Sequence, residues 1–138
     1  MKRAIACVVI LLLASPAAAG SSRPWGRGGY IAEFQPVIDQ YNASGDLMRI
    51  EGHCQSLCTL FLGLRNVCVA RGARLLFHAG HNRRMEINAG STARMMSAYN
   101  GPLRQYLTAG GYMETLAFHT IPGAMMIDRF GYKECPRG

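Results

Sequence analysis

Several features that are common in other protein classes are missing from this chain. It has no internal repeat and no low-complexity tract. Its longest apolar run, residues 4–14, is about half the length of roughly 20 residues that a membrane-spanning helix needs. It contains no Cys-x-x-Cys pair, and its 8 acidic residues face 15 basic ones. These absences argue against a repeat protein, a membrane-spanning protein and a zinc ribbon.

The first nineteen residues have the order of a secretory signal peptide. Lys2 and Arg3 form a positive start, residues 4–14 an apolar segment, and residues 15–19 (SPAAA) a small-residue cleavage site. We therefore predict that residues 1–19 are removed and that residues 20–138 are exported as a single domain to the periplasm or the extracellular space. After cleavage no membrane association is expected.

Positive charge is carried almost entirely by arginine. The net charge is +7, and removing Lys2 and Arg3 lowers it to 7 − 2 = +5. Apart from the adjacent pair Arg83 and Arg84, the arginines are scattered along the chain. A nucleic-acid-binding domain more often concentrates basic residues in one stripe with aromatic residues between them. The sequence therefore predicts a solvated basic surface and no nucleic-acid partner.

Four cysteines follow the signal peptide: Cys54, Cys58, Cys68 and Cys135. An even number in an exported chain predicts two disulfides, and the sequence leaves all three pairings open. Zinc is the alternative, because His53 precedes Cys54 and Cys58 follows four residues later. Because no second pair of ligands follows at regular spacing, we favour disulfides and predict no metal and no cofactor.

The apolar pattern predicts helices that alternate with short strands. Helices are expected at 31–41, 57–64, 92–99 and 103–108, and strands at 47–51, 66–70, 74–78 and 124–127. Pro36 should either kink the first helix or delay its start, and Ser91 should be able to cap the third helix. Residues 20–29 are expected to form a loop, because they are rich in Gly, Ser and Pro. The fold class predicted is α/β, with a short, mostly parallel sheet flanked by helices.

One stretch concentrates the residues that carry chemistry. Residues 52–59 (GHCQSLCT) predict a turn that places Ser56 at the start of a buried helix, and residues 74–78 (RLLFH) predict a strand that ends at His78. A serine and a histidine at such element ends are two members of a Ser–His–acid triad. The alternatives are an ordinary N-cap for Ser56 and a hydrogen-bonded strand-end residue for His78.

These residues resemble the core of the ClpP/crotonase superfamily. The matching series is Gly52-x-x-x-Ser56-Leu57, then Cys68-Val69, then Ala73-Arg74-x-x-x-His78. In the Clp protease subunit a G-x-x-A-S-M turn carries the nucleophile and an A/S-R-x-x-I-H strand carries the base. The cysteines make the chain most similar to uncharacterised bacterial periplasmic members with the pattern G-x-C-x-S-A-C-T, then C-V-x-x-x-A-x-L-x-F-H. The resemblance covers residues 26–80 well and 99–135 loosely, and it implies a small, truncated ClpP/crotonase-like domain.

The resemblance also implies a role for each residue of the site. Ser56 would be the nucleophile, and His78 would act first as general base and then as general acid. Gly28-Gly29 is similar to the superfamily's P-G-G segment, so the N–H groups of Gly29 and Leu57 would form the oxyanion hole. Glycine suits this position because a backbone without Cβ can approach a tetrahedral intermediate closely.

The third member of the triad is less well marked. Asp128 lies 128 − 78 = 50 residues after His78, a separation similar to that of the Clp acid, and Glu114 is the other candidate. Arg27 stands where the superfamily has proline, and the strand that should precede the two glycines is missing. The chain also ends soon after Cys135, without the region on which Clp rings depend, so no large proteolytic chamber is expected.

Two functions of different classes follow from these observations. The first is an exported Ser–His hydrolase that acts on a peptide or acyl bond, with feeble or lost activity as one outcome. The second is a non-catalytic periplasmic binding protein that uses the cleft formed by Gly29, Ser56 and His78. In the second case the loop that carries Arg83 and Arg84 would contact an acidic or peptide partner.

Overall fold

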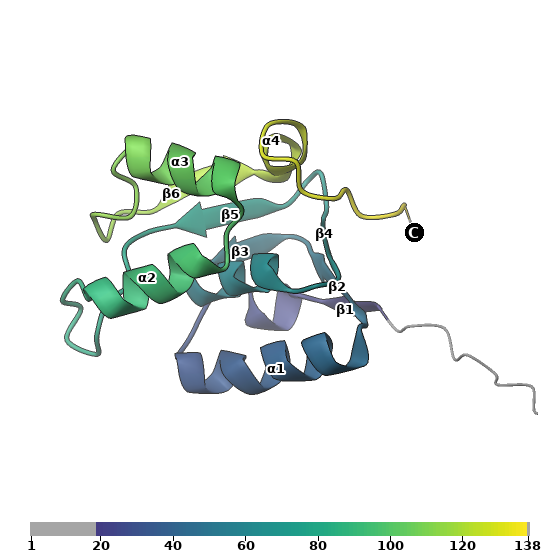
Figure 1. Ribbon diagram of the computed structural model, residues 1–138, viewed down its shortest axis with the longest axis horizontal. Coiled ribbons are helices and arrows are strands. Elements are labelled where there is room, and N and C mark those ends of the chain that lie inside the picture. Colours follow the sequence, from purple (N-terminus) through teal and green to yellow (C-terminus); the bar gives the residue numbers. More distant parts are fainter. Residues whose placement is uncertain (1–18, 138) are drawn as a thin grey trace, which may run out of the picture.

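The computed structural model describes residues 19–137, which form a mixed α/β fold (Figure 1). Except for Ala19, the predicted signal peptide lies outside the described residues. In Figure 1, α1 (Ile31–Ser44) runs along the lower edge, α3 (Gly101–Ala109) and α4 (Gly123–Asp128) lie at the upper edge, and the strands lie between them. None of the helices within residues 19–137 is long and apolar enough to cross a membrane.

The first sheet is parallel and has the order β1 (Ala19–Ser21), β2 (Leu47–Ile50), β4 (Val67–Val69). A strand does precede the two glycines: it is β1, and one short 3₁₀ helix, η1 (Arg23–Trp25), follows it. The prediction of a loop throughout residues 20–29 was wrong at this point. Three small residues have little strand propensity of their own, and their geometry comes from pairing with β2.

The second sheet has the order β3 (His53–Gln55), β5 (Arg74–Phe77), β6 (His119–Pro122). β3 and β5 are parallel, and β6 is antiparallel to β5. The expectation of a single, mostly parallel sheet is thus met only in part: most strand pairs are parallel, but the strands form two short sheets, and the second sheet is mixed. The strand predicted at 124–127 was wrong, since this segment forms α4, and the strand lies just before it.

The first helix is confirmed and is longer than predicted. Pro36 lies inside α1 and removes one intrahelical hydrogen bond. Phe34 and Ile38 are buried on the inner face of the helix, and this burial outweighs the lost hydrogen bond. At its start, the Glu33 carboxylate accepts the backbone N–H of Tyr30 at 2.9 Å.

The two helices that follow the second sheet's central strand begin at asparagine caps. Asn88 accepts the N–H of Ser91 at 2.8 Å before α2 (Ala89–Ser97), and Asn100 accepts the N–H of Leu103 at 3.1 Å before α3. The predicted cap at Ser91 was therefore wrong by one turn. Both asparagines satisfy N–H groups that the first turn of a helix leaves free.

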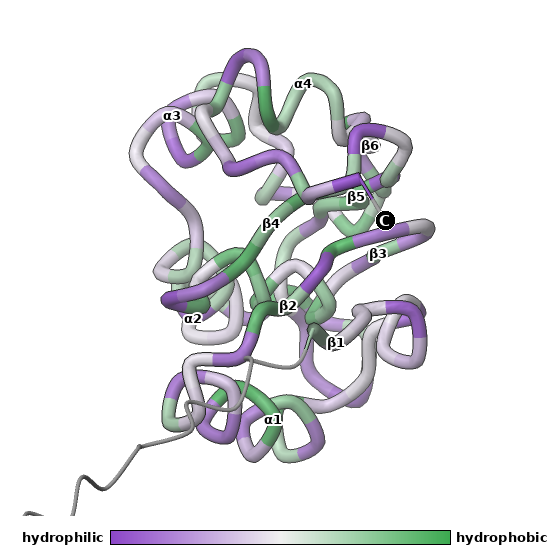
Figure 2. The backbone as a smooth tube through the Cα atoms, turned by 90° about the vertical axis from the view of Figure 1, so that its right-hand side faces the viewer, coloured by the Kyte–Doolittle hydropathy of each residue, from purple (hydrophilic) through white to green (hydrophobic). Residues whose placement is uncertain are grey.

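The centre of the fold is η2 (Ser56–Gly63), a 3₁₀ helix whose residues 58–62 are buried. The prediction of a buried helix here is confirmed, although its geometry is 3₁₀. Phe61 packs against Phe34 and Trp25, with ring centroids 5.5 and 6.4 Å away. The buried hydroxyls of Thr59 and Tyr99 lie 2.6 Å apart. Figure 2 shows hydrophobic residues along β4, which lies beside this centre.

Two disulfides join the four cysteines, as predicted. Cys54 pairs with Cys58, and Cys68 pairs with Cys135. The second bond ties β4 to the C-terminal segment, which also runs beside Val69 through backbone hydrogen bonds. Disulfides form and persist in oxidising compartments, so the pairing is consistent with an extracellular or periplasmic protein.

Candidate active site

A single cavity of about 700 Å³ brings together four of the five residues for which the resemblance implied catalytic roles. Gly29, Ser56, Leu57 and His78 all line it. The cavity lies where the start of α1, the start of η2 and the end of β5 meet the loop that leads to α2. Its volume lies within the range of about 300–1,000 Å³ that is typical of small-molecule sites.

Ser56 occupies the junction between β3 and η2 in an unusual backbone conformation. Its φ is +53°, in the left-handed region that costs a non-glycine residue about 1–2 kcal/mol. Gln55, not Ser56, holds the N-cap position, and the Ser56 hydroxyl makes no hydrogen bond within residues 19–137. The interpretation of Ser56 as an N-cap was therefore wrong. A strained serine with a free hydroxyl at a strand-to-helix turn is an arrangement found at nucleophiles.

The Cys54–Cys58 disulfide encloses this turn. It joins Cys54, the middle residue of β3, to Cys58 in the first turn of η2, so Ser56 lies at the middle of a five-residue ring. A short covalent ring restricts the backbone of every residue inside it. We attribute the persistence of the left-handed Ser56 conformation to this restriction, together with the burial of both cysteines.

The glycine segment lies directly against the turn. Gly28 has φ +74°, and a Cβ at this position would lie 3.0 Å from Ser56 Cβ and 3.5 Å from the Leu57 nitrogen. The N–H groups of Gly29 and Leu57 donate to no other group within residues 19–137. Two free N–H groups beside a serine hydroxyl are the donors that an oxyanion hole needs.

Gln55 is a positioning residue that the sequence reasoning missed. Its backbone N–H donates to Gly26 O at 2.9 Å, and its side-chain amide donates to Arg27 O at 3.0 Å. These two bonds hold the glycine segment against β3. The only sequence signal was its position beside Ser56.

His78 follows β5 and is almost completely buried, with 4 % of its surface exposed. Its Nδ1 has no hydrogen-bond partner within residues 19–137. Phe118 meets the ring edge-on with centroids 5.0 Å apart, and His81 stacks on it at 5.6 Å. Burial, the largest effect, lowers the pKa of the imidazole; the Ala79 backbone opposes this lowering, and the smaller effect of His81 adds to it. His78 is therefore neutral at pH 7, as a general base must be.

The serine and the histidine line the same cavity but are not hydrogen-bonded to each other within the described residues: no such bond joins Ser56 Oγ to either nitrogen of His78. Catalytic hydrogen bonds are often long or poorly aligned before substrate binds. The arrangement therefore supplies a base near the hydroxyl but not an activated nucleophile.

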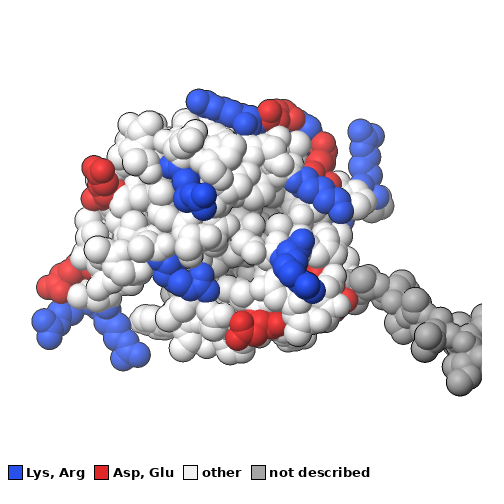
Figure 3. Space-filling model, viewed as in Figure 1, with Lys and Arg blue, Asp and Glu red and all other residues white. Residues whose placement is uncertain are grey.

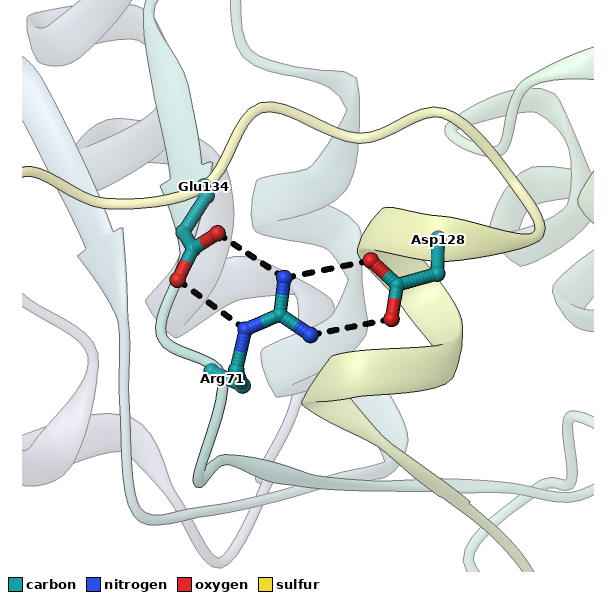
Figure 4. A network of polar contacts seen from close by, with 3 residues as sticks. All are labelled: Arg71, Asp128 and Glu134. Atoms are coloured by element: carbon teal, nitrogen blue, oxygen red, sulfur yellow. Dashed lines mark hydrogen bonds and ion pairs between the residues drawn. The ribbon is translucent and has the colours of Figure 1, made fainter.

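The structure does not bring Asp128 to His78, which corrects the assignment of this residue as the orienting acid. Both carboxylate oxygens of Asp128 accept hydrogen bonds from Arg71 at 2.9 and 3.1 Å, and Arg71 also binds Glu134 (Figure 4). Arg71 lowers the pKa of both carboxyl groups through these bonds. Glu114 does not line the cavity either. Neither Asp128 nor Glu114 therefore accepts a hydrogen bond from His78 Nδ1, which is the contact that would fix the imidazole tautomer.

The cavity is cationic. Its lining includes Arg83 and Arg94 but no Asp or Glu. Arg94 donates to the Gln35 amide oxygen at 2.8 Å, and the Arg83 guanidinium lies 5.4 Å from the centre of the Tyr30 ring. Neither arginine pairs with a carboxylate within residues 19–137. Figure 3 shows basic side chains at the tip of the loop that precedes α2.

The metal interpretation finds no support in the geometry. Cys54 and Cys58 are joined in a disulfide and so present no thiolate. No group of three or more His, Cys, Asp or Glu side chains in the described part of the chain is arranged to hold a metal ion.

The site can therefore bind an anionic or polarised group beside a strained serine and a neutral, buried histidine. Comparison with models of protein families, with curated proteins and with solved structures gave no match to this chain.

Proposed function

We propose that this protein is an exported Ser–His hydrolase of ClpP/crotonase-like architecture that cleaves an acyl or peptide bond. The observation that carries the proposal is the left-handed Ser56, which shares one cavity with the neutral, buried His78 and the free N–H groups of Gly29 and Leu57. A strain of about 1–2 kcal/mol persists only where the surroundings impose it, and such residues cluster at active sites. The two disulfides support a periplasmic or extracellular location.

In the proposed mechanism, His78 removes the proton from Ser56 Oγ as the oxygen attacks the substrate carbonyl carbon. The N–H groups of Gly29 and Leu57 then stabilise the negative oxygen of the tetrahedral intermediate, and one such donor is worth about 3–4 kcal/mol. His78 returns the proton to the leaving alcohol or amine, which leaves an acyl group on Ser56. Water, activated by the same imidazole, releases the acid and restores the serine.

In the described part of the chain no acidic side chain lines the cavity with His78, and this favours slow turnover. When the orienting aspartate of a triad is lost, catalysis falls by about 10⁴-fold, because the imidazole is no longer held in the correct tautomer. Here Nδ1 of His78 is buried without a partner. The same observation favours the second candidate function, a binding protein in which the cavity holds a ligand without cleaving it.

Labelling with a fluorophosphonate probe distinguishes the two functions. We expect the purified, oxidised protein to be labelled at Ser56, and both Ser56→Ala and His78→Ala to abolish labelling. Ser91→Ala is the matched control, because Ser91 lines the same cavity. Labelling that survives in Ser56→Ala, or that is absent from the wild type, would reject the hydrolase.

Stability measurements on Ser56 variants provide a second test. Glycine adopts the left-handed conformation freely, so Ser56→Gly should raise the free energy of unfolding by about 1 kcal/mol, whereas Ser56→Ala should leave it nearly unchanged. A serine that costs stability and can be improved by glycine is retained for its hydroxyl. A large loss in Ser56→Ala would instead indicate a structural role.

A further inference from the structure

The exposed apolar side chains of the molecule gather around one cavity. Within residues 19–137 the large hydrophobic residues that remain exposed are Tyr30, Ile31, Met85, Ile87 and Phe118. The first three line the cavity. Phe118 meets His78 edge-on, and Ile87 pairs with His81 across the loop. Apolar patches of this kind, rimmed by polar residues, mark binding sites.

Met85 adds a backbone observation to this patch. Its φ is +60°, which is costly for an unbranched apolar residue, yet its side chain is exposed at the cavity wall. No neighbour rewards this conformation by burying the side chain. In the free protein Met85 therefore carries both backbone strain and an exposed apolar side chain. A ligand that covers the side chain would remove the second cost.

The charged groups of the lining are all of one sign. Arg83 and Arg94 face the cavity without a carboxylate partner, and the lining contains no acid. Gln35 holds Arg94 and the Tyr30 ring holds Arg83, so both guanidinium groups are positioned before a ligand arrives. Unpaired, positioned arginines in a concave site favour an anionic ligand group.

The polar groups of the loop are used up within it. Asn82 Oδ1 accepts the N–H groups of Arg84 and Glu86, at 2.9 and 3.0 Å, and its amide donates to the Glu86 carboxylate at 2.7 Å. Asn88 is occupied as the cap of α2. Beside the serine, the N–H of Gln55 in β3 is already bonded to Gly26 O. Recognition of a peptide by strand addition needs free backbone donors and acceptors along a strand edge, and the only free donors that the described chain shows here are the N–H groups of Gly29 and Leu57.

We infer that the cavity binds a single-chain anionic amphiphile, with its apolar chain against Tyr30, Ile31 and Met85 and its compact anionic group paired with Arg83 and Arg94. This inference rests on the proposed function for one part only: it names an acyl ester with an anionic head group as the substrate that Ser56 cleaves. Binding itself does not require catalysis, so the two statements are tested separately.

Titration calorimetry on the oxidised Ser56→Ala protein tests the binding. The probes are dodecyl phosphate, dodecyltrimethylammonium and dodecyl maltoside, each kept below its critical micelle concentration. We expect dodecyl phosphate to bind with a stoichiometry of one, and about tenfold or more tightly than the cationic and neutral probes, because charge-assisted contacts are worth about 1.5–3 kcal/mol. Equal affinity for all three probes, or a stoichiometry well above one, would overturn the inference.

Two variants locate the ligand. Met85→Asn removes the apolar side chain, and Asn tolerates the left-handed conformation, so the variant should fold and bind dodecyl phosphate about tenfold more weakly. Arg83→Gln combined with Arg94→Gln should weaken binding at least as much and remove the preference for the anionic probe. Arg65→Gln, at an exposed position outside the cavity, is the matched control. Unchanged affinity in both cavity variants would contradict the inference.

A peptide arm separates the two classes of ligand. An acidic peptide with apolar residues that binds more tightly than dodecyl phosphate would replace the amphiphile as the ligand class. Dodecyl phosphate binding without fluorophosphonate labelling of the wild type would leave a binding protein for amphiphiles and reject the hydrolase. Labelling without amphiphile binding would keep the hydrolase and reject the substrate class.

Discussion

Two arginine-containing regions of this molecule differ in how completely their polar groups are satisfied. At the end of β4, the Arg71 guanidinium donates to Asp128 and Glu134 on both sides, and every oxygen of the two carboxylates is used (Figure 4). At the cavity, Arg83 and Arg94 have no carboxylate partner in the described chain, and His78 Nδ1 has no hydrogen-bond partner there.

The difference separates a structural cluster from the candidate site. The Arg71 cluster is exposed, and its acids join α4 and the C-terminal segment to the turn after β4. At the cavity the Ser56 backbone is strained, and the N–H groups of Gly29 and Leu57 are free. Two arginines without a carboxylate partner lie there beside exposed apolar side chains. A fold tolerates such costs where a ligand or a reacting group will later use them.

The largest effects are expected when each disulfide is removed in turn: loss of one bond should mainly lower stability, and loss of the other should mainly lower the reactivity of Ser56. The Cys68–Cys135 bond closes a span of 67 residues and the Cys54–Cys58 bond a span of 4. In the chain-entropy model, replacing Cys68 and Cys135 by serine should lower the unfolding free energy by about 4 kcal/mol. Replacing Cys54 and Cys58 by serine should lower it by about 2 kcal/mol. Urea unfolding measures both losses.

Fluorophosphonate labelling of the same two double variants should show the reverse order. Loss of the Cys54–Cys58 bond releases the ring that holds Ser56, so labelling should fall sharply even where the protein is fully folded. Loss of the Cys68–Cys135 bond should leave labelling near that of the wild type under folding conditions. The opposite pattern would mean that Ser56 does not depend on its ring.

A pair of glycine variants tests the contact between Gly28 and Ser56. Gly28 and Gly131 have nearly the same φ, +74° and +75°, but only Gly28 lies against another group where a Cβ would be added. Both Gly→Ala variants should lose about 1–2 kcal/mol of unfolding free energy, because alanine is strained in this conformation. Only Gly28→Ala should also lose labelling at Ser56. Equal labelling in the two variants would contradict the proposed oxyanion hole.

The pH dependence of stability should report on the buried histidine. Because burial lowers the pKa of His78 below its ordinary value of 6.5, the unfolded chain binds this proton more readily than the folded chain. The unfolding free energy should therefore fall as pH drops from 6.5 to the lowered pKa, and then stop changing on account of this group. Labelling should persist below pH 6.5 for the same reason.

The control for this titration is His78→Asn, which should remove part of the pH dependence. His119 has a pKa that burial also lowers, so a smaller dependence of the same sign should remain in the variant. A His78→Asn protein with the full dependence of the wild type would show that His78 titrates normally.

The smallest effect on the labelling of Ser56 is expected for Arg71, which is paired with two carboxylates. Hydrogen bonds from Arg71 lower the pKa of Asp128 and of Glu134, so each contributes stability at neutral pH that is lost as pH falls through the lowered pKa. In Arg71→Gln both pKa values should rise, as measured by NMR titration of the carboxyl groups, while labelling of Ser56 stays unchanged. A loss of labelling would connect Asp128 to the site after all.

The parts of the fold that could be predicted are those with strong local signals. The apolar face of residues 31–41 predicted α1 despite Pro36, and the apolar run at 57–64 predicted a buried helix. Segments with weak patterns failed. β1 was missed because its geometry depends on pairing with β2, and residues 124–127 were taken for a strand although they form α4.

The candidate site divides in the same way. Ser56 and His78 could be selected from their neighbours in the chain, and the structure places both at one cavity. Asp128 was selected by its separation from His78 alone, and the structure places it with Arg71 instead. Sequence separation does not determine spatial proximity when the intervening helices are free to place a residue on another face of the fold.

The chemical groups of this protein, and the local elements that carry them, can be identified from the amino-acid sequence alone. The even number of cysteines, the serine before an apolar run and the histidine after a short strand are all local facts. The disulfide pairing, the left-handed backbone of Ser56, the lack of a hydrogen-bond partner for His78 Nδ1 and the cationic cavity are visible only in the folded protein. The Cys68–Cys135 bond and the cavity depend on contacts between segments far apart in the chain, and no local pattern encodes the distance between such segments.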